Sequence, residues 1–359
     1  MVLHGGGNTS VKTQVDGEDI LYVKGSGWDL VSIKAEGFAP VKLQTLLEMA
    51  KLEKLSDSDM VSGQKAAMID KNAPNPSVEA ILHALIPFKY VDHTHADAVV
   101  TISNSVNGLE HIAKLYPNFL IVPYVMPGFV LAQRIYEMAK DMDWSKCEGI
   151  ILHNHGIFTF DENAKISYEK MIDAVSLAEA FLEKNAPIQI ENINITKNCD
   201  INKIKTEISK AKGYDVVLNV NQSPLALFYA SAKDLKTFAS RGILTPEHII
   251  RTKRVPLIIT EGTLQENLQT YIDSYIEYFE KFAKDEVCLN PAPNYMVVQN
   301  SAVISFGKTK KEADIINDIV EHTMLAVLRA DKLGGYKGIS LKDCFEMEYW
   351  ELEQAKLKK

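Results

Sequence analysis

Residues 91–97, with the sequence VDHTHAD, constrain the fold of this chain more than any other stretch. The stretch is typical of a β-strand, in which successive side chains point to opposite faces, so His93 and His95 share one face and Thr94 is turned away. A second apolar run, GIILHNHG, carries His153 and His155, which would also share a face, so either could supply a third imidazole. Three imidazoles that meet at one point and leave a coordination position open are the ligand set of a catalytic metal, most often zinc. The fold must therefore bring these two runs together.

The composition is that of a soluble globular protein. The chain has 359 residues, enough for two domains of ordinary size, and 46% of them are hydrophobic, enough for a sizeable core. The formal net charge of −8 argues against a nucleic acid or an anionic membrane surface as the main partner. No apolar run approaches the roughly 20 residues of a membrane span, and residues 1–7 lack the charged and apolar regions of a signal peptide.

The cysteines lie far apart in the sequence and form no CxxC pair: Cys147, Cys199, Cys288 and Cys344. This usage is typical of thiols in a reducing compartment rather than of disulfides or metal ligands. Together with the absence of a signal peptide, it predicts a cytoplasmic protein.

Two glycine-rich stretches near the start of the chain are candidates for binding an anion. Residues 4–12 (HGGGNTSVK) combine glycines, which let backbone N–H groups approach a ligand, with short polar side chains and the charge of Lys12. Residues 25–27 (GSG) follow an apolar strand and offer similar N–H groups. A plain glycine-rich turn capped by small polar residues is the alternative for the first stretch.

Hydrophobic periodicity places further elements along the first half. Asp16-Gly17 predicts the turn of a β-hairpin, residues 40–54 have helical spacing, and Asn75-Pro76-Ser77 predicts a break that starts the next helix. Glu79 lies in the first turn of that helix, where a carboxylate often only complements the helix dipole. Residues 98–102 could form a strand or a helix. A strand is expected at residues 120–125, and helices are expected at 129–142 and 165–184.

An Asn-, Ile- and Lys-rich stretch at residues 184–205 predicts a connector between two domains. Beyond it the pattern of the first half recurs at a shift of 146 residues, so that Asn154 falls on Asn300. A true repeat would keep the scaffold in the second half without the metal site, and chance similarity of strand–turn–helix segments is the alternative. The shift places the site residues as follows: His93 on Ala239, His95 on Arg241, His155 on Ser301 and Glu79 on Leu225.

Several short motifs, taken in order and spacing, resemble the class II aldolase/adducin family: Gly7-Asn8-Thr9-Ser10, Gly25-Ser26-Gly27, Pro76-Ser77-Val78-Glu79, His93-Thr94-His95 and Asn154-His155-Gly156. This resemblance covers about residues 4–184. A later stretch, RGILTPEHIIRTKRVP at residues 241–256, is similar to the aldolase half of bifunctional rhamnulose-1-phosphate aldolase/alcohol dehydrogenases. It extends the resemblance over nearly the whole chain.

The resemblance implies a role for each matched residue. His93, His95 and His155 would bind a divalent metal ion, by analogy zinc. Glu79 occupies the position of the catalytic carboxylate, and Tyr124 that of a tyrosine which family aldolases offer across a subunit interface to the aldehyde oxygen. The residues that fall where the family holds the substrate phosphate are Asn8, Ser26, Gly27 and Ser77.

The resemblance also implies an α/β fold with three layers, in which helices flank a central, mainly antiparallel sheet. The catalytic domain is expected at residues 1–190 and a related, degenerate domain at residues 206–359. The implied activity is zinc-dependent cleavage of a ketose 1-phosphate, such as rhamnulose 1-phosphate, to dihydroxyacetone phosphate and an aldehyde. The substrate is then a small sugar phosphate, and the implied assembly is a homo-oligomer, for example a tetramer.

The chain departs from the family in three respects. Val78 stands where the family has a second phosphate-site serine, so one donor is missing or is supplied elsewhere. His155 is preferred to His153 as the third ligand because the family's ligand directly precedes glycine. Only four residues precede the glycine turn, which suggests a late start site or a truncated gene model. No dehydrogenase half follows, so NAD binding is not expected.

Two alternatives of different classes remain open. One is another enzyme on the same metal scaffold, a pentulose-phosphate 4-epimerase or a sugar-phosphate dehydratase. The other is a non-catalytic binding protein of the adducin kind, against which the intact Glu79 and the three histidines argue. The remaining histidines in apolar surroundings are interpreted as core residues: His83, His111, His248 and His322.

Overall fold

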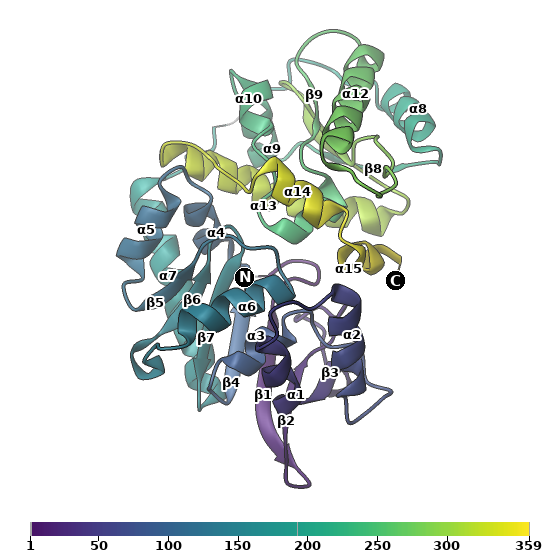
Figure 1. Ribbon diagram of the computed structural model, residues 1–359. Helices are drawn as coiled ribbons and strands as arrows, with labels where there is room; N and C mark the ends of the chain where they lie inside the picture. Colours follow the sequence, from purple (N-terminus) through teal and green to yellow (C-terminus); the bar gives the residue numbers. More distant parts are fainter. Residues whose placement is uncertain (1, 192, 359) are drawn as a thin grey trace. The chain divides into compact units, whose positions relative to one another are not determined.

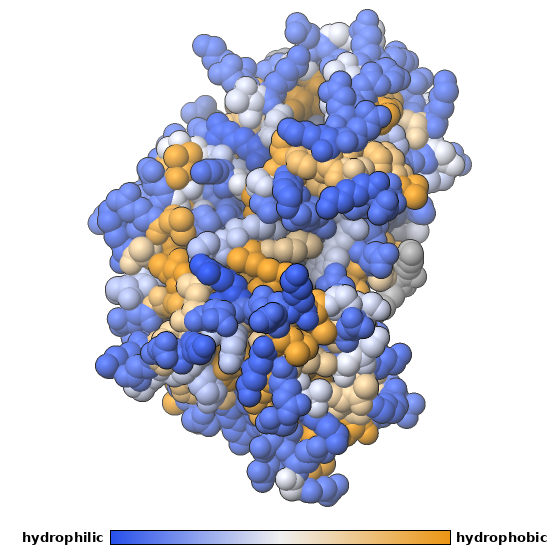
Figure 2. All heavy atoms as spheres, in the orientation of Figure 1, coloured by the Kyte–Doolittle hydropathy of each residue, from blue (hydrophilic) through white to orange (hydrophobic). Residues whose placement is uncertain are grey.

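The computed structural model describes residues 2–191 and 193–358 and divides the chain into two compact units. The first unit comprises Met1–Ser103, Gly108–Phe181 and Ala355–Lys359, and the second comprises Asn104–Asn107 and Leu182–Gln354. The expected domains and connector also include Met1, Asn192 and Lys359, which lie outside the described residues. In the described part of the chain, no helix combines the length and apolarity that crossing a membrane requires. Hydrophilic residues cover most of the face drawn in Figure 2.

A seven-stranded sheet forms the centre of the first unit, in the order β3-β2-β1-β4-β7-β6-β5 (Figure 1). Strands β5 and β6 are parallel, and every other neighbouring pair is antiparallel, which confirms the expected sheet type. The strands are β1 (Asn8–Val15), β2 (Glu18–Lys24), β3 (Phe38–Lys42), β4 (Tyr90–Thr94), β5 (Phe119–Val122), β6 (Gly149–Leu152) and β7 (Gly156–Asp161).

Helices cover both faces of this sheet. Their bounds are α1 (Leu43–Ala50), α2 (Asp57–Ala66), α3 (Ala80–Leu85), α4 (Asp97–Ser103), α5 (Gly108–Leu115), α6 (Phe129–Ala139) and α7 (Ala164–Asn185), with short 3-10 turns at η1 (Ala35–Gly37), η2 (Trp144–Lys146) and η4 (Ala355–Lys358). Thr94 of β4 donates a hydrogen bond to the sulfur of Met171 in α7 at 3.2 Å, which places α7 on one face. His83 of α3 packs edge-on against Phe158 of β7 on the opposite face. The expected three-layer arrangement is therefore confirmed.

Local sequence explains most of these boundaries. The β1–β2 hairpin closes through Asp16 and Gly17, both with positive φ (50° and 80°), as the Asp-Gly turn predicts. Residues 40–42, expected to be helical, instead pair with β2 as part of β3, and the helix starts at Leu43. Residues 98–102, which fitted either a strand or a helix, lie in α4. Strand β5 ends at Val122 because the next residue is a proline, which has no N–H group to donate to a ladder.

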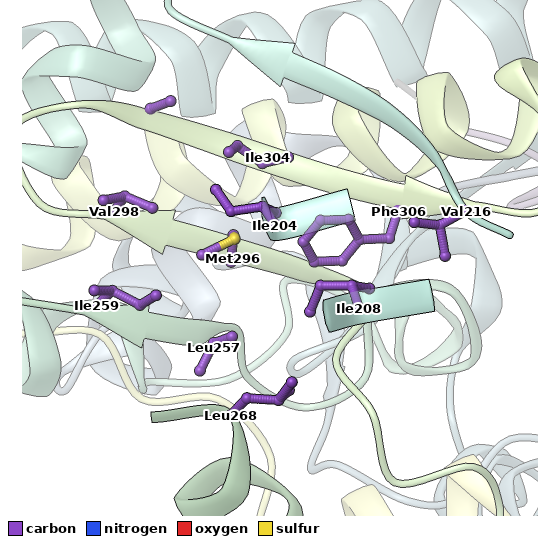
Figure 3. Packing of buried hydrophobic residues seen from close by; sticks show 11 residues of the cluster. Ile204, Ile208, Val216, Leu257, Ile259, Leu268, Met296, Val298, Ile304 and Phe306 are labelled. Atoms are coloured by element: carbon purple, nitrogen blue, oxygen red, sulfur yellow. The ribbon is translucent and has the colours of Figure 1, made fainter. Parts of the chain in front are cut away.

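The second unit contains a four-stranded sheet in the order β8-β11-β10-β9. Its strands are β8 (Val217–Asn221), β9 (Leu257–Ile259), β10 (Tyr295–Val298) and β11 (Ala302–Gly307). Figure 3 shows Ile204 and Ile208 of α8 packed against Met296 and Phe306 of the sheet. The helices are α8 (Ile201–Lys212), α9 (Pro224–Ala230), α10 (Leu235–Ala239), α11 (Ile249–Thr252), α12 (Leu264–Phe282), α13 (Lys310–Lys332), α14 (Leu341–Glu348) and α15 (Glu351–Gln354), with a 3-10 turn at η3 (Pro246–His248).

Part of the second unit repeats the first at the expected shift. Strands β10 and β11 and the start of α13 lie 146 residues after β6, β7 and the start of α7, and the turns agree as well. Asn154 and Asn300, the corresponding turn residues, both have positive φ, at 58° and 56°. The predicted repeat therefore describes a real strand–turn–strand–helix unit.

The shift is wrong for the strand that carries the two histidines. In the first unit His93 pairs with Phe158, and in the second unit Val220 of β8 pairs with Ile304, the counterpart of Phe158. The structural counterpart of His93 is therefore Val220, whereas Ala239 belongs to α10. A single shift fails because the chain between β8 and β10 is longer than that between β4 and β6.

Lys12 was expected to contribute charge to an anion-binding turn, but its ammonium group has another use. Nζ donates hydrogen bonds to the carbonyl oxygens of His83 at 2.8 Å, Ile86 at 2.7 Å and Phe88 at 2.8 Å. Carbonyls at the C-terminal end of a helix have no intrahelical partner. Lys12 therefore caps α3 and holds it against the sheet.

Replacing Lys12 with methionine should destabilise the first unit by about 1–3 kcal/mol, because buried carbonyls lose their donor. The measurement is the urea unfolding midpoint of the full chain. Lys114→Met is the matched control, since Lys114 forms an exposed pair with Glu110 on α5 and its replacement should shift stability by less than about 0.5 kcal/mol. Equal midpoints for the two variants would contradict the capping role of Lys12.

Candidate functional site

Three histidines from two segments meet where interior strands of the first sheet end. His93 is on β4, His95 follows the end of that strand, and His155 lies in the turn between β6 and β7. The ligand nitrogens of the three side chains lie within 4.8 Å of one another, and all three residues are buried. The Nε2 atoms of His93 and His95 are 2.9 Å apart. Among the residues that the structure describes, His155 joins this cluster and His153 does not.

The surroundings of His93 leave its Nε2 atom available to a ligand. Its Nδ1 atom lies 3.0 Å from the carbonyl oxygen of Ile157, which can only accept, so Nδ1 carries the proton and donates. The ring stacks on Phe158 with centroids 4.0 Å apart. Burial, opposed by the nearby Glu79, holds the pKa of His93 well below its usual value, so the ring stays neutral, the form that binds metals.

Gly156 allows the histidines to come together. A Cβ atom at this position would lie 2.4 Å from the carbonyl oxygen of Thr94, 2.9 Å from a ring carbon of His93 and 3.1 Å from a ring carbon of His95. Any side chain here would therefore push the two rings apart. The glycine that follows His155 in the sequence is required by the packing of the rings.

Glu79 brings a carboxylate to the same point from the residue that precedes α3. Its Oε1 atom lies 3.6 Å from Nε2 of both His93 and His155, and it has no hydrogen-bond partner among the described residues. Its Oε2 atom accepts a hydrogen bond from the Asn8 amide at 2.7 Å. Burial alone would raise the pKa of Glu79, but the histidines and the Asn8 hydrogen bond outweigh it and lower the pKa to about 2.

This donor set fits a divalent cation. It combines three imidazole nitrogens with a buried carboxylate oxygen that lacks a hydrogen-bond partner among the described residues, and such mixed nitrogen and oxygen sets suit zinc and similar ions. Three histidine ligands leave a coordination position for water or substrate. The residues present could therefore hold a catalytic metal ion.

Two of the four residues expected to bind phosphate lie beside Glu79. The Asn8 amide nitrogen donates to Ser77 Oγ at 3.0 Å as well as to Glu79, so both of its hydrogens are used inside the protein. Ser77 Oγ also accepts a hydrogen bond from the backbone N–H of Glu79 at 3.3 Å. Asn8 therefore orients the carboxylate in this structure.

The other two, Ser26 and Gly27, lie in the turn after β2. The Ser26 N–H donates to the carbonyl oxygen of Asn75 at 2.8 Å, which ties this turn to the segment that leads into Ser77. Gly27 has a φ of 88°, a value that favours glycine. Lys24, which sequence reasoning did not single out, is buried and donates to the carbonyl oxygen of Trp28 at 2.7 Å, closing the turn.

Tyr124 lies two residues beyond β5, close in sequence to Val122, whose carbonyl accepts a hydrogen bond from the His153 N–H at 2.9 Å. This bond joins the end of β5 to the turn that carries His155. Tyr124 therefore follows the same end of the strands at which the histidine cluster lies.

His83, interpreted from the sequence as a core residue, is buried as expected but is also connected to the site. Its Nδ1 atom lies 2.8 Å from Ser10 Oγ, and its Nε2 atom contacts Asn8 Oδ1. The signal in the sequence is the spacing of Glu79 and His83, which lie four residues apart, about one turn of the helix expected there.

Comparison with known proteins gives two consecutive family matches. Residues 1–182 match the class II aldolase and adducin N-terminal domain, and residues 196–357 match the second domain of class II aldolases. The chain is also 28% identical over 383 residues to a protein of Bacillus subtilis (strain 168) named uncharacterized oxidoreductase YuxG, with coverage of 98% of this chain and 55% of that protein. The chain thus spans about half the length of this curated relative.

Solved structures that resemble the chain cover about half of it. One is the N-terminal class II aldolase domain of a conserved protein from Thermoplasma acidophilum, with 39% identity, a TM-score of 0.47, and coverage of 50% of this chain and 85% of that chain. Another is the L-fuculose-1-phosphate aldolase of Thermus thermophilus, with 15% identity, a TM-score of 0.34, and coverage of 51% and 86%.

Gly156→Ala should lower the affinity for zinc by about 10- to 100-fold, because the new methyl group displaces His93 or His95. The measurement is equilibrium dialysis against zinc with a competing chelator. Gly338→Ala is the matched control, because its nearest neighbours lie 3.5 Å from an added Cβ, an ordinary contact distance. Unchanged zinc affinity in the Gly156 variant would rule out the histidine cluster as the zinc site.

Proposed function

We propose, from the premise that this chain belongs to the class II aldolase and adducin family, that it is a metal-dependent aldolase. Its substrate would be a ketose 1-phosphate resembling rhamnulose 1-phosphate, and its products dihydroxyacetone phosphate and an aldehyde. The observation that carries the proposal is the buried cluster of His93, His95 and His155 with the carboxylate of Glu79 against it.

The three histidines would hold the metal ion, for which zinc is the first candidate. When bound, such an ion supplies Lewis-acid stabilisation of the negative charge that develops on substrate oxygen atoms. The hydrogen bond from His93 Nδ1 to Ile157 fixes that ring, so its Nε2 atom keeps its position through turnover.

Glu79 would carry the proton transfers. Its lowered pKa keeps the carboxylate ionised at neutral pH, so it acts first as a base and accepts the proton of the substrate hydroxyl whose carbon becomes the aldehyde. Cleavage of the carbon–carbon bond leaves the bonding electron pair on the fragment that bears the carbonyl group. Glu79 then returns its proton to that carbon, and dihydroxyacetone phosphate can leave as a neutral ketone.

The phosphate group would be held by Ser26, Gly27 and Ser77, with Asn8 beside them. The two turns that carry these residues are joined by the Ser26–Asn75 hydrogen bond, so donors far apart in sequence are fixed together. Anchoring the phosphate fixes the distance from the reacting carbons to Glu79 and the histidines, which is a large part of catalysis in such reactions. Val78 offers no donor, so this anion site relies on fewer side chains.

A homo-oligomer, such as a tetramer, would complete the site. In the proposed assembly the phenol of the partner subunit's Tyr124 donates a hydrogen bond to the oxygen that becomes the aldehyde oxygen as the bond breaks. Sedimentation velocity at micromolar concentration tests this point, and a monomer there would exclude Tyr124 acting between subunits. The proposed compartment is the cytoplasm, where the four free thiols would stay reduced.

His93→Ala should abolish both zinc binding and aldol cleavage, because one of three ligands is lost. The assays are metal content per chain and release of dihydroxyacetone phosphate from a panel of ketose 1-phosphates. The second unit has Val220 and Ser301 at the positions of His93 and His155, so wild-type protein should bind one zinc ion per chain. Conversion of ribulose 5-phosphate without any release of dihydroxyacetone phosphate would replace the proposal with an epimerase.

Glu79→Gln should lower kcat by about 10²- to 10⁴-fold while zinc binding persists, because the amide keeps the shape of the carboxylate but cannot accept the proton. Glu162→Gln, a change of the same chemistry at an exposed position, should leave kcat unchanged. Wild-type turnover in the Glu79 variant would show that another group moves the proton.

A further inference from the structure

His83 is fully buried in α3, and both of its ring nitrogens have polar partners. Nδ1 lies 2.8 Å from Ser10 Oγ, and Nε2 contacts Asn8 Oδ1. Packing alone does not explain this arrangement, because an apolar side chain could also fill the space beside Phe158 without the cost of burying two polar atoms. The partners of the ring therefore indicate what it does.

The direction of each hydrogen bond follows from Glu79. An ionised carboxylate can only accept, so the Asn8 group at 2.7 Å from it must be the amide nitrogen. The Asn8 oxygen then faces His83 and requires a donor, so His83 carries its proton on Nε2. Nδ1 is left without a proton and accepts one hydrogen bond from the Ser10 hydroxyl.

We propose that His83 is a positioning residue: through a one-way chain from Ser10 to His83 to Asn8 it sets the orientation of the Glu79 carboxylate. The chain holds Oε2 of Glu79 and leaves Oε1 directed at Nε2 of His93 and His155, 3.6 Å away. Without the Nε2 proton the Asn8 amide is free to rotate by half a turn and to present its oxygen to the carboxylate. Two acceptors would then face each other, and Glu79 would turn away.

The neutral state of the ring suits this role. Burial lowers the pKa of His83 to about 3, with Glu79 opposing the shift and Lys12 reinforcing it, so the ring stays neutral throughout the physiological range. A neutral ring with a single N–H donor can transmit an orientation, because reversing the tautomer would leave the Asn8 oxygen facing an unprotonated ring nitrogen, that is, a second acceptor.

Two conservative variants separate the ring nitrogens. In His83→Gln the side-chain amide nitrogen reaches approximately the position of Nε2 and can still donate to Asn8, whereas in His83→Asn the shorter amide reaches only the position of Nδ1. We expect kcat of the Gln variant to stay within about threefold of wild type. The Asn variant should lose about 10- to 100-fold in kcat with KM nearly unchanged, because a misplaced carboxylate slows the proton transfer and does not take part in binding the substrate.

Matched controls come from His111 on α5, whose ring packs on Phe181 in the same unit. His111→Gln and His111→Asn should leave kcat unchanged. The chain of hydrogen bonds also predicts strong coupling: in an Asn8→Ala background, His83→Asn should add less than about a threefold further loss, since its effect passes through Asn8. Additive losses in that double variant, or equal kcat values for the Gln and Asn variants, would overturn the proposal.

The kinetic part rests on the proposed aldolase activity, so a readout independent of turnover is needed. In metal-free wild-type protein, nitrogen-15 NMR of the histidine rings should show His83 neutral with the proton on Nε2 from about pH 5 to 8. Asn8→Ala, which removes the acceptor of the Nε2 proton, should yield a mixture of tautomers. A proton on Nδ1 in the wild type would overturn the proposal whatever the activity, whereas the expected tautomer in a protein without aldolase activity would contradict only the proposed function.

Discussion

One buried carboxylate, that of Glu79, constrains how the elements around the histidine cluster must be arranged. An isolated ionised carboxylate in a protein interior costs several kcal/mol unless it is paired or hydrogen-bonded, so Glu79 can be buried only if other groups meet it there. Asn8 satisfies one of its oxygens, and the histidine cluster faces the other. The pairing of β1 with β4, in which Asn8 lies opposite His93, brings both groups to one point. Gly156 lets the rings of His93 and His95 approach closely enough to form the cluster that faces Glu79.

The part of this site that follows from local geometry could be predicted from the sequence. Alternation along β4 correctly placed His93 and Thr94 on opposite faces, since Thr94 contacts Met171 on the far side. The links from Asn8 to Ser77 and Glu79 span about seventy residues, and only the tertiary fold reveals them. The same limit explains the error about Lys12, whose carbonyl partners lie at the end of α3 and in the residues after it, about seventy residues away in the sequence.

The fold of the second unit shows why the sequence predicted the counterparts of the histidines only in part. The segment from β6 to the start of α7 recurs in the second unit at one constant shift because its loops have the same lengths as those between β10 and the start of α13. The shift fails at β8 because it assumes equal connections, and only strand pairing identifies Val220 as the counterpart of His93. The counterpart of His93 was thus misassigned, whereas Ser301 keeps the predicted position of His155 and the expectation of a related fold was confirmed.

Strand pairing also explains why the second unit could not acquire this site by restoring histidines alone. In the first sheet β4 lies between β7 and β1, and β1 supplies Asn8. In the second sheet β8 is the edge strand, so among the described residues no neighbouring strand occupies the place of β1. A carboxylate buried there would lack the amide that orients it. The scaffold that brings Asn8, Glu79 and His93 together is therefore the β1–β4 pair with the segment that leads into α3.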